Sequence, residues 1–486
     1  MTSSFSPGQF AQLRAGVVGI DHEVPLLDGS TVPYVNLDNA ATTPPLREVV
    51  EAIEHFLPYY SSVHRGSGFK SRLSTVVYDQ AHEIMGRFVG ADPDTNTVIF
   101  GKNTTEAINK LSYRLNLAPD AVVLTTQMEH HSNDLPWRDR ANVVHVRSTP
   151  DGMLDEADFD RLLARHSPHV ALVAVTAASN VSGFVQPIHR LARKAHQAGA
   201  MILVDAAQLV AHRSLDMRPD DDPEHIDFVA LSGHKMYAPF GTGALIGPQQ
   251  VFLRDGPEYS GGGTVDIVTL DEVHWTGLPD REESGSPNII GAVAMAAAAQ
   301  SLMALGMANI SAHEDELIAY TLRRLQSIPE IKVYGSSDPH RSGEKVGVVP
   351  FNVAGLSHFL VAAILGYEHG IGVRNGCFCA HPYVVHLLDL SEREQQLWRK
   401  QAVDGDKTSL PGMVRASLGC YNNEEDIDRL AESLQMIAGG EYRGDYVVHQ
   451  PSGDYIPASY DERFADFFLL RPYEPTTEVG HGACGN

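Results

Sequence analysis

Three side chains that could act together each follow an apolar segment of the chain. Lys235 follows the apolar run in "VALSGHKMYAPFGTGALIG", Asp205 ends the run in "MILVDAAQ", and His130 lies in "QMEHHSN", directly after a third run. A lysine amine can form a Schiff base, a carboxylate can hold a ring nitrogen protonated, and a flat imidazole can stack on an aromatic ring. On its position alone Lys235 would be an ordinary turn lysine, so its interpretation depends on the other two side chains.

Short β-branched runs alternate with helical patterns through the middle of the chain. The runs lie at 97–100, 121–126, 170–179 and 201–207. This alternation is typical of an α/β fold in which helices cover both faces of a mainly parallel sheet. Because ligands bind at the carboxyl ends of such strands, we expect the lysine, the carboxylate and the imidazole to meet at that edge.

The length of the chain, 486 residues, exceeds that of a usual single domain. The alanine-rich segment "IIGAVAMAAAAQSLMALG" is apolar on all sides, so it predicts a long buried helix that leads into a second domain. The predicted units are an N-terminal segment at 1–35 that joins the small domain, a large cofactor-binding domain at 36–299, a small α+β domain at 300–440 and a C-terminal extension at 441–486.

Composition and charge restrict the function to small-molecule chemistry. A formal net charge of −24 opposes binding to nucleic acid or to an anionic membrane surface. The N-terminal residues do not form a signal-peptide pattern, and no apolar run is long enough to span a bilayer. Four cysteines are too few for a disulfide scaffold of this size. We therefore expect a soluble, cytoplasmic protein with reduced thiols.

An amine, an acid and a flat ring at one sheet edge are the groups that pyridoxal phosphate requires. Further motifs follow in order from about 36 to 430: "NLDNAATTPP", "HRGSGFKS", "GKNTTEAIN", "TQMEHHSNDLPWR", "SNVSG", "LVDAAQ", "LSGHKMYAPFGTGALIG", "GVRNGCFCAHP" and "PGMVRASLGCYNNEEDIDRL". In these motifs the sequence resembles the class V aminotransferase family of fold-type I pyridoxal-phosphate enzymes, and within it the type II cysteine desulfurases and selenocysteine lyases. The resemblance implies a large α/β domain and a smaller C-terminal α+β domain.

The resemblance also implies which residues hold the cofactor. Lys235 would bind it covalently, Asp205 would contact the pyridine nitrogen, and His130 would stack on the ring as a catalytic residue. Gln208 would lie near the phenolate oxygen. The phosphate would lie at a helix N-terminus, which favours anions, among Thr104, Thr105, Ser232 and His234. Two simpler interpretations stay open: Asn103 or Thr104 could be a plain N-cap, and His234 a turn histidine.

Substrate and subunit contacts follow from the same resemblance. Arg415 in "RASL" would clamp the substrate carboxylate, with Arg374 as a second candidate and Asn180 at the border of the site. Ser286 in "EESGSPN" replaces a threonine that the family brings to the phosphate from the neighbouring subunit, which implies a homodimer. No metal site is predicted.

Cys379 in "RNGCFCAHP" aligns with the nucleophile of the desulfurases. The implied reaction, catalysed by a sulfurtransferase or lyase, takes sulfur from L-cysteine and leaves L-alanine and a persulfide on Cys379. An acceptor protein or a thiol would then remove the sulfur. The alternatives are a C–S lyase, epimerase or aminotransferase acting on another amino acid, and a non-catalytic scaffold that keeps the fold.

Two features depart from the desulfurase pattern. Cys377 precedes Cys379 by two positions, and this "CFC" is similar to molybdenum-cofactor sulfurases, so a sulfur transferase of that kind is a further alternative. A charged stretch at 388–409 exceeds the usual spacing and begins with a capping box at Ser391 and Glu394, which predicts a helix that serves as a lid or docks a partner. A metal site at Cys377, Cys379 and His381 is also conceivable, although it lacks the second ligand pair of structural zinc sites.

Overall fold

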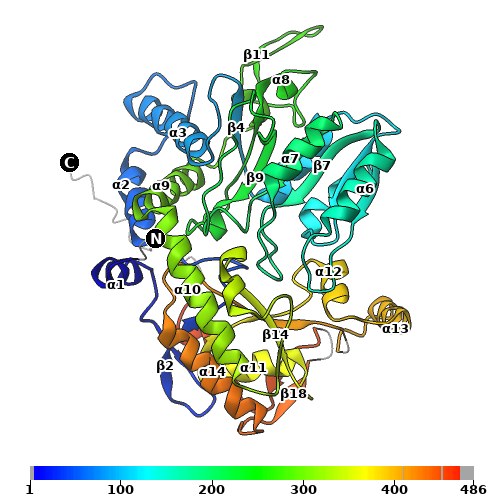
Figure 1. The fold of residues 1–486 in the computed structure, drawn as a ribbon. Coiled ribbons are helices and arrows are strands. Elements are labelled where there is room, and N and C mark those ends of the chain that lie inside the picture. Colours follow the sequence, from blue (N-terminus) through cyan, green and yellow to red (C-terminus); the bar gives the residue numbers. More distant parts are fainter. Residues whose placement is uncertain (1–4, 409, 450–451, 471–486) are drawn as a thin grey trace, which may run out of the picture.

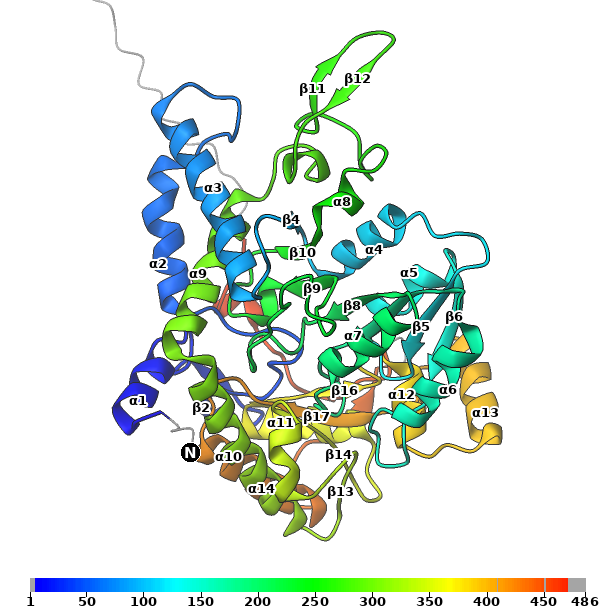
Figure 2. The same ribbon diagram turned by 45° about the horizontal axis from the view of Figure 1, so that its top comes forward.

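The computed structural model describes residues 5–408, 410–449 and 452–470 (Figures 1 and 2). Its centre is a seven-stranded sheet in the order β4-β10-β9-β8-β7-β5-β6. The strands are β4 (Asn96–Gly101), β5 (Val122–Thr126), β6 (Asn142–Val146), β7 (Val170–Thr176), β8 (Met201–Asp205), β9 (Phe228–Ser232) and β10 (Gly243–Pro248). β10 runs antiparallel to β4 and β9, and the remaining pairs in this sheet are parallel, so the predicted mainly parallel sheet is confirmed.

Strands that are covered on both faces need apolar residues at successive positions. All five residues of β5 and of β9 are buried, and alternate residues enter different cores: Val122 and Leu124 pack on one side of the sheet and Val123 on the other. The four runs that predicted strands became β4, β5, β7 and β8. The same pattern missed β6, which is half-exposed at the sheet edge, and β10, which begins with a glycine.

Helices cover both faces of this sheet, as predicted (Figure 2). One face packs against α2 (Arg47–Phe56), α3 (Phe69–Phe88), α6 (Glu156–His166), α7 (Ile188–Gln197) and α9 (Ile289–Leu305). The other face packs against α4 (Thr104–Arg114), α5 (Leu135–Arg138) and α8 (Gln249–Phe252). The alanine-rich α9 is buried along most of its length, which its composition predicted.

A second, antiparallel sheet has the order β13-β14-β17-β16 and its own core. It consists of β13 (Ile331–Val333), β14 (Val348–Val353), β17 (Met413–Ser417) and β16 (Arg374–Gly376), with α10 (Met307–Gln326), α11 (His358–His369) and α14 (Glu424–Ala438) packed on it. Val35, at the end of the predicted N-terminal segment, and Leu37, just beyond it, enter this core. Their strand β3 (Val35–Asn36) pairs with β15 (Ile371–Gly372). The predicted domain limits stay a prediction.

Smaller elements surround these two sheets. They are α1 (Pro7–Ala15), β1 (Glu23–Pro25) with β2 (Thr31–Pro33), the hairpin β11 (Val265–Val268) with β12 (Val273–Trp275), α12 (His381–Leu387), α13 (Glu392–Val403), and β18 (Tyr446–Val448) with β19 (Tyr455–Pro457). The predicted capping box is confirmed, because Ser391 and Glu394 open α13. Within the described ranges no single helix is long and apolar enough to cross a membrane; α9 and α10, bent by 75°, pass that test only as a pair.

Gly243 allows β10 to lie against the start of α4. A Cβ atom at this position would lie 2.6 Å from the Cα atom of Asn103 and 2.7 Å from the carbonyl oxygen of Leu231. Both are backbone atoms of well-packed elements, so Gly243→Ala should destabilise the fold by roughly 1–3 kcal/mol, as overpacking does. Thermal unfolding measures the effect. Gly262→Ala is the matched control, because nothing lies within 4 Å of its added Cβ, and equal unfolding midpoints for the two variants would contradict the prediction.

Candidate active site

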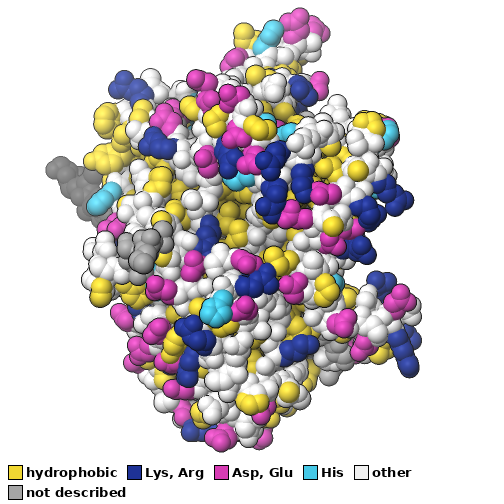
Figure 3. Space-filling view, viewed as in Figure 1, with side chains coloured by type: hydrophobic (Ala, Val, Ile, Leu, Met, Phe, Trp, Pro, Cys, Tyr) yellow, Lys and Arg dark blue, Asp and Glu magenta, His cyan; other side chains and the backbone are white. Residues whose placement is uncertain are grey.

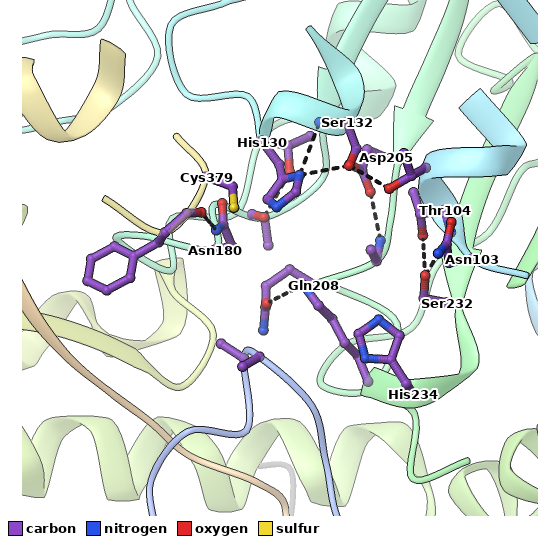
Figure 4. Close-up of a pocket in the computed structure, with 18 of the residues that line it drawn as sticks. Asn103, Thr104, His130, Ser132, Asn180, Asp205, Gln208, Ser232, His234 and Cys379 are labelled. Carbon is purple, nitrogen blue, oxygen red and sulfur yellow. Dashed lines mark hydrogen bonds between the residues drawn. The ribbon is translucent and has the colours of Figure 1, made fainter. Parts of the chain in front are cut away.

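A cavity of about 460 Å³ opens at the carboxyl edge of the large sheet (Figure 4). Its walls come from the ends of β7, β8 and β9, the start of α4, the loop after β5 and the second sheet. The predicted residues that line it are Thr104, Thr105, His130, Asn180, Asp205, Gln208, Ser232, His234, Lys235, Arg374, Cys379 and Arg415. Ser286 is exposed and does not line the cavity, so its contribution to a neighbouring subunit stays a prediction.

Lys235 reaches into the cavity from the turn that follows β9. The turn is η3 (Gly233–Lys235), and it is closed by the Gly233 amide, which donates to the carbonyl oxygen of Thr242 at 2.8 Å. The Lys235 ammonium donates to Oε1 of Gln208 at 3.3 Å. Burial disfavours the charged amine and lowers the pKa of Lys235 to about 8, although the Asp205 carboxylate acts in the opposite direction. A lysine with this pKa can supply a neutral, nucleophilic amine near neutral pH.

Asp205 is the last residue of β8 and is buried. Its Oδ1 atom accepts a hydrogen bond from the Ala207 amide at 3.0 Å. Burial raises the pKa of Asp205, while the Ala207 amide and the charge of Lys235 work to lower it. A buried carboxylate of this kind gains a strong contact from any protonated ring nitrogen that enters the cavity.

His130 lies in the loop after β5 and begins η2 (His131–Asn133). Its Nδ1 atom accepts a hydrogen bond from the Ser132 amide at 3.1 Å and lies 3.0 Å from the Ser132 hydroxyl (Figure 4). Burial lowers the pKa of His130 to about 3, so the ring is neutral at physiological pH. A neutral, oriented imidazole in the cavity is suited to stacking on a flat ligand.

Hydroxyl groups gather where α4 begins. The Thr104 amide donates to Oγ of Ser232 at 2.8 Å, and the two hydroxyl oxygens lie 2.7 Å apart. The Thr105 hydroxyl lies 2.7 Å from that of Ser132. Asn103 is the N-cap, because its side chain accepts from the Glu106 amide at 3.0 Å. The cap is therefore Asn103 and not Thr104, and the helix N-terminus with its hydroxyls is suited to an anionic group.

His234 lies beside this anion-binding end and is half-buried. Burial lowers the pKa of His234 to about 4, and the nearby charge of Lys235 acts in the same direction. Its carbonyl oxygen accepts from the Thr43 amide at 2.9 Å, which fixes the turn against the loop before α2. The ring is neutral at physiological pH, so it can offer a hydrogen bond but no charge to an anion.

Two arginines from the second sheet meet at Asp38. Arg415 in β17 is buried; it donates through Nη2 to Oδ1 of Asp38 at 3.0 Å and through Nη1 to the carbonyl oxygen of Asn180 at 2.9 Å. Burial lowers the pKa of Arg415 to about 10. Arg374 is exposed, with Nε 3.4 Å from Oδ2 of Asp38. Among the described residues the buried Nε of Arg415 has no partner, so this guanidinium retains capacity to bind a carboxylate.

The loop at 377–379, which carries two thiols and is called the thiol loop below, has a strained backbone beside these arginines. Phe378 and Cys379 have φ angles of 52° and 55°, a left-handed conformation that costs about 1–2 kcal/mol for each residue with a side chain. Two hydrogen bonds hold the loop there: Asn180 donates to the Phe378 carbonyl at 2.8 Å, and the His131 amide donates to the Cys379 carbonyl at 2.8 Å. The loop therefore presents an exposed Cys379 thiol to the cavity.

Cys377 has a different environment from Cys379. Its Sγ donates to the carbonyl oxygen of Pro411 at 3.0 Å, and burial raises the pKa of Cys377 to about 12. A thiol with this pKa stays protonated and is a poor nucleophile. Within the part of the chain that the structure describes, the ligand atoms of Cys377, Cys379 and His381 do not converge, so the geometry gives the alternative metal site no support.

Helix α13 in the inserted stretch contacts the surroundings of the thiol loop through aromatic rings. Trp398 stacks on His381 with centroids 5.7 Å apart, and His381 stacks on His131 at 4.8 Å. The two histidines also approach through Nδ1 and Nε2 at 3.0 Å. None of the side chains that α13 presents is fully buried, so the Trp398 stack is a main attachment of this helix.

Sequence patterns missed several residues of the site. Asp38 lies in the quoted motif "NLDNAATTPP", but its pairing with two arginines depends on the second sheet. Ser132 directly follows the two histidines of "EHHSN", and a serine two residues after His130 is the signal that could have identified it. Phe378, whose ring lies 4.8 Å from the Arg415 guanidinium, gave no signal of its own.

Comparisons with known proteins agree with this fold. The family model for aminotransferase class-V matches residues 35–430. A cysteine desulfurase of Haloferax volcanii is 35% identical over 416 residues, which span 84% of this chain and 90% of that protein. The apo structure of a cysteine desulfurase from Thermococcus onnurineus aligns with a TM-score of 0.76 and 30% identity, covering 90% of this chain and 100% of that chain. A cysteine desulfurase of Escherichia coli aligns with a TM-score of 0.72 and 26% identity, covering 91% and 100%.

The ionisation of Lys235 can be measured in protein from which small ligands have been removed. Its amine should titrate with a midpoint at about pH 8 instead of 10.5, as followed by the pH dependence of its labelling by an amine-reactive reagent and by peptide mapping. Asp205→Asn should lower the midpoint further, because the carboxylate favours the charged amine. A midpoint near 10.5 in the unaltered protein would show that the cavity does not desolvate this lysine.

Proposed function

This chain belongs to the class-V aminotransferase family, and from that premise we propose that it is a pyridoxal-phosphate-dependent cysteine desulfurase. The proposed reaction converts L-cysteine to L-alanine and leaves the sulfur on Cys379 as a persulfide. The observation that carries it is the presence of an exposed Cys379 thiol in the same cavity as Lys235 and Asp205. A thiol at this place gives the sulfur of a bound substrate a nucleophile that other reactions of the family do not need.

The residues of the cavity fit pyridoxal phosphate. An anion-binding helix end with the Ser232 hydroxyl suits its phosphate, the buried Asp205 carboxylate suits its ring nitrogen, and the amine of Lys235 suits its aldehyde. Gln208, 3.3 Å from the Lys235 amine, suits its phenolate oxygen. When bound, the cofactor supplies an electron sink that makes the Cα proton of an amino acid acidic.

The chain's own residues then bind and deprotonate the substrate. Arg415, oriented by Asp38, is the proposed clamp for the substrate carboxylate. Arg374, which contacts the same Asp38 and lines the cavity, is the second candidate. Lys235, once its amine is free, is the proposed base that moves the Cα proton, since its lowered pKa of about 8 is suited to proton transfer near neutral pH.

In the next proposed step the thiolate of Cys379 attacks the sulfur of the substrate. A bond forms between its Sγ and the substrate sulfur, the bond from that sulfur to the substrate Cβ breaks, and its electron pair stays with the substrate, where protonation gives alanine. The sulfur remains on Cys379 for an acceptor. The molybdenum-cofactor-sulfurase-like alternative would involve Cys377 as well, but Cys377 bonds to Pro411 and its pKa is raised to about 12, which favours Cys379 as the only nucleophile.

We further propose that the active unit is a homodimer in the cytoplasm. The hairpin β11–β12 projects from the body of the chain (Figure 2) and exposes apolar side chains, with Ile267 at 58%, Val268 at 59% and Leu270 at 103% of full exposure. An exposed apolar hairpin is typical of a surface that a partner covers. Ser286 is exposed too, so a second copy is the proposed recipient of its hydroxyl.

The cofactor assignment can be tested chemically. Borohydride reduction of the purified protein should fix pyridoxal phosphate to Lys235, as peptide mapping by mass spectrometry would establish. Lys235→Ala should abolish this adduct but retain some cofactor through the phosphate contacts, since Ser232 and the start of α4 are unchanged. Adduct formation on another lysine would overturn the assignment of the whole site.

The reaction class can be tested with thiol variants and a panel of amino acids. With L-cysteine, the protein should form alanine and a protein-bound persulfide. Cys379→Ser should lower the rates of alanine and persulfide formation by more than about 100-fold, because the nucleophile is lost. Cys377→Ser, the matched control two residues away, should still form alanine in a single turnover. Pyruvate and ammonia as products, or an undiminished rate in Cys379→Ser, would instead favour the lyase, epimerase or aminotransferase alternative.

A further inference from the structure

The thiol loop needs support from its surroundings. The Ala380 amide donates to the carbonyl oxygen of Cys377 at 2.9 Å and closes a turn, and both residues between them, Phe378 and Cys379, have positive φ angles. Glycine, asparagine and aspartate are the residues that favour such positions. Because neither a phenylalanine nor a cysteine does, the turn persists only where other contacts hold it.

His131 contacts this turn and the residue that follows it. Its amide donates to the Cys379 carbonyl at 2.8 Å, and its ring nitrogen Nε2 lies 3.0 Å from Nδ1 of His381. The His381 amide also approaches Nε2 of His131, at 3.5 Å. A backbone amide only donates, so Nε2 of His131 accepts and Nδ1 of His381 carries the proton. The segment 379–381 is thus joined to His131 at both of its ends.

Trp398 of α13 packs on the ring of His381. The two ring planes are 19° from parallel and their centroids are 5.7 Å apart, which is an offset stack. The indole Nε1 atom is buried, and among the described residues it has no hydrogen-bond partner. A buried donor without a partner is unfavourable, so the ring contact, and not a hydrogen bond, determines where the indole lies. This contact helps to shield His381 from water that would compete for its hydrogen bond to His131.

α13 lies at the edge of the molecule beside α12 (Figures 1 and 2), in a region whose surface carries charged side chains of both signs (Figure 3). The charged residues of this helix that are exposed include Glu392, Arg393, Glu394, Arg399 and Lys400. In the described part of the chain, the ion pairs and side-chain hydrogen bonds of α13 reach no residue outside its own start at 390–395. Leu397, next to Trp398, is 57% exposed. Trp398 is therefore the side chain through which this helix can act on the site.

We propose that Trp398 is a positioning residue for sulfur transfer. Through His381 and His131 it keeps the thiol loop in the strained turn that presents the Cys379 thiol to the cavity. The inserted stretch at 388–409 then acts on the reaction without contacting the substrate. This role rests on the proposed function, because only a reaction at the Cys379 sulfur depends on where this thiol lies.

Amide hydrogen exchange in the purified protein, without substrate, measures the support of the turn directly. Trp398→Ala should speed the exchange of the His131 and Ala380 amides by about 3- to 10-fold, the factor that one aromatic contact provides. Leu397→Ala is the matched control, because it removes an exposed apolar side chain from the same helix, and it should leave both amides unchanged. Equal exchange in the unaltered protein and in Trp398→Ala would overturn the proposal.

Single-turnover kinetics with L-cysteine test whether the contact matters for the reaction. Trp398→Ala should slow alanine and persulfide formation by about 3- to 10-fold. The half-saturating concentration of L-cysteine should stay the same, because Arg415 and the cofactor contacts are not altered. Trp398→Phe, which keeps a ring over His381, should retain most of the rate. A raised half-saturating concentration without a loss of rate, or no rescue by phenylalanine, would exclude a positioning role.

A double variant tests the route through His381. His381→Ala should slow the reaction at least as much as Trp398→Ala, and adding Trp398→Ala to it should cause no further loss, since the contact between the two rings is already absent. Full additivity of the two losses would contradict this route. If the unaltered protein forms no alanine from L-cysteine, the proposed function fails and the positioning role fails with it, while the exchange experiment separately decides whether Trp398 supports the turn.

Discussion

The site depends on the burial of opposite charges at the ends of two neighbouring strands. β8 ends at Asp205, β9 ends just before the turn of Lys235, and Asp205 pairs with Ala230 across the ladder. Removing an ammonium and a carboxylate from water is costly, and mutual attraction offsets only part of that cost. The sheet supports the arrangement because its apolar strands, covered on both faces, supply the packing that holds these two groups out of water.

The second sheet completes the site through a small polar network. Arg415 joins distant parts of the chain, since it donates both to Asp38, shortly after β3, and to the Asn180 carbonyl in the loop after β7. Asn180 in turn donates to Phe378 and so holds the thiol loop. The groups proposed to bind the substrate and to attack its sulfur therefore share partners, and the position of one is linked to the position of the other.

Sequence patterns identified the functional groups that lie at or directly after the ends of strands. Lys235, Asp205 and His130 could be placed at one edge because each follows a buried apolar run, and such runs are recognisable without tertiary information. Asp38 could not be placed in this way, because its arginine partners are distant in the sequence and meet it only through the second sheet. Ser132 was overlooked although it lies only two residues after His130. β10 was missed because its glycines favour a loop, and only pairing with β4 and β9 makes it a strand.

The single antiparallel strand determines how Lys235 can move. Ser232 and Gly243, on either side of the lysine's turn, are paired in the ladder between β9 and β10, and Gly233 bonds to Thr242 immediately inside it. Backbone hydrogen bonds thus hold the main chain on both sides of the turn that contains Lys235. The Cα atom of Lys235 stays in place, and the methylene groups of its side chain can rotate. A change of the partner that the Lys235 amine contacts then requires only rotations within the side chain and no displacement of a loop.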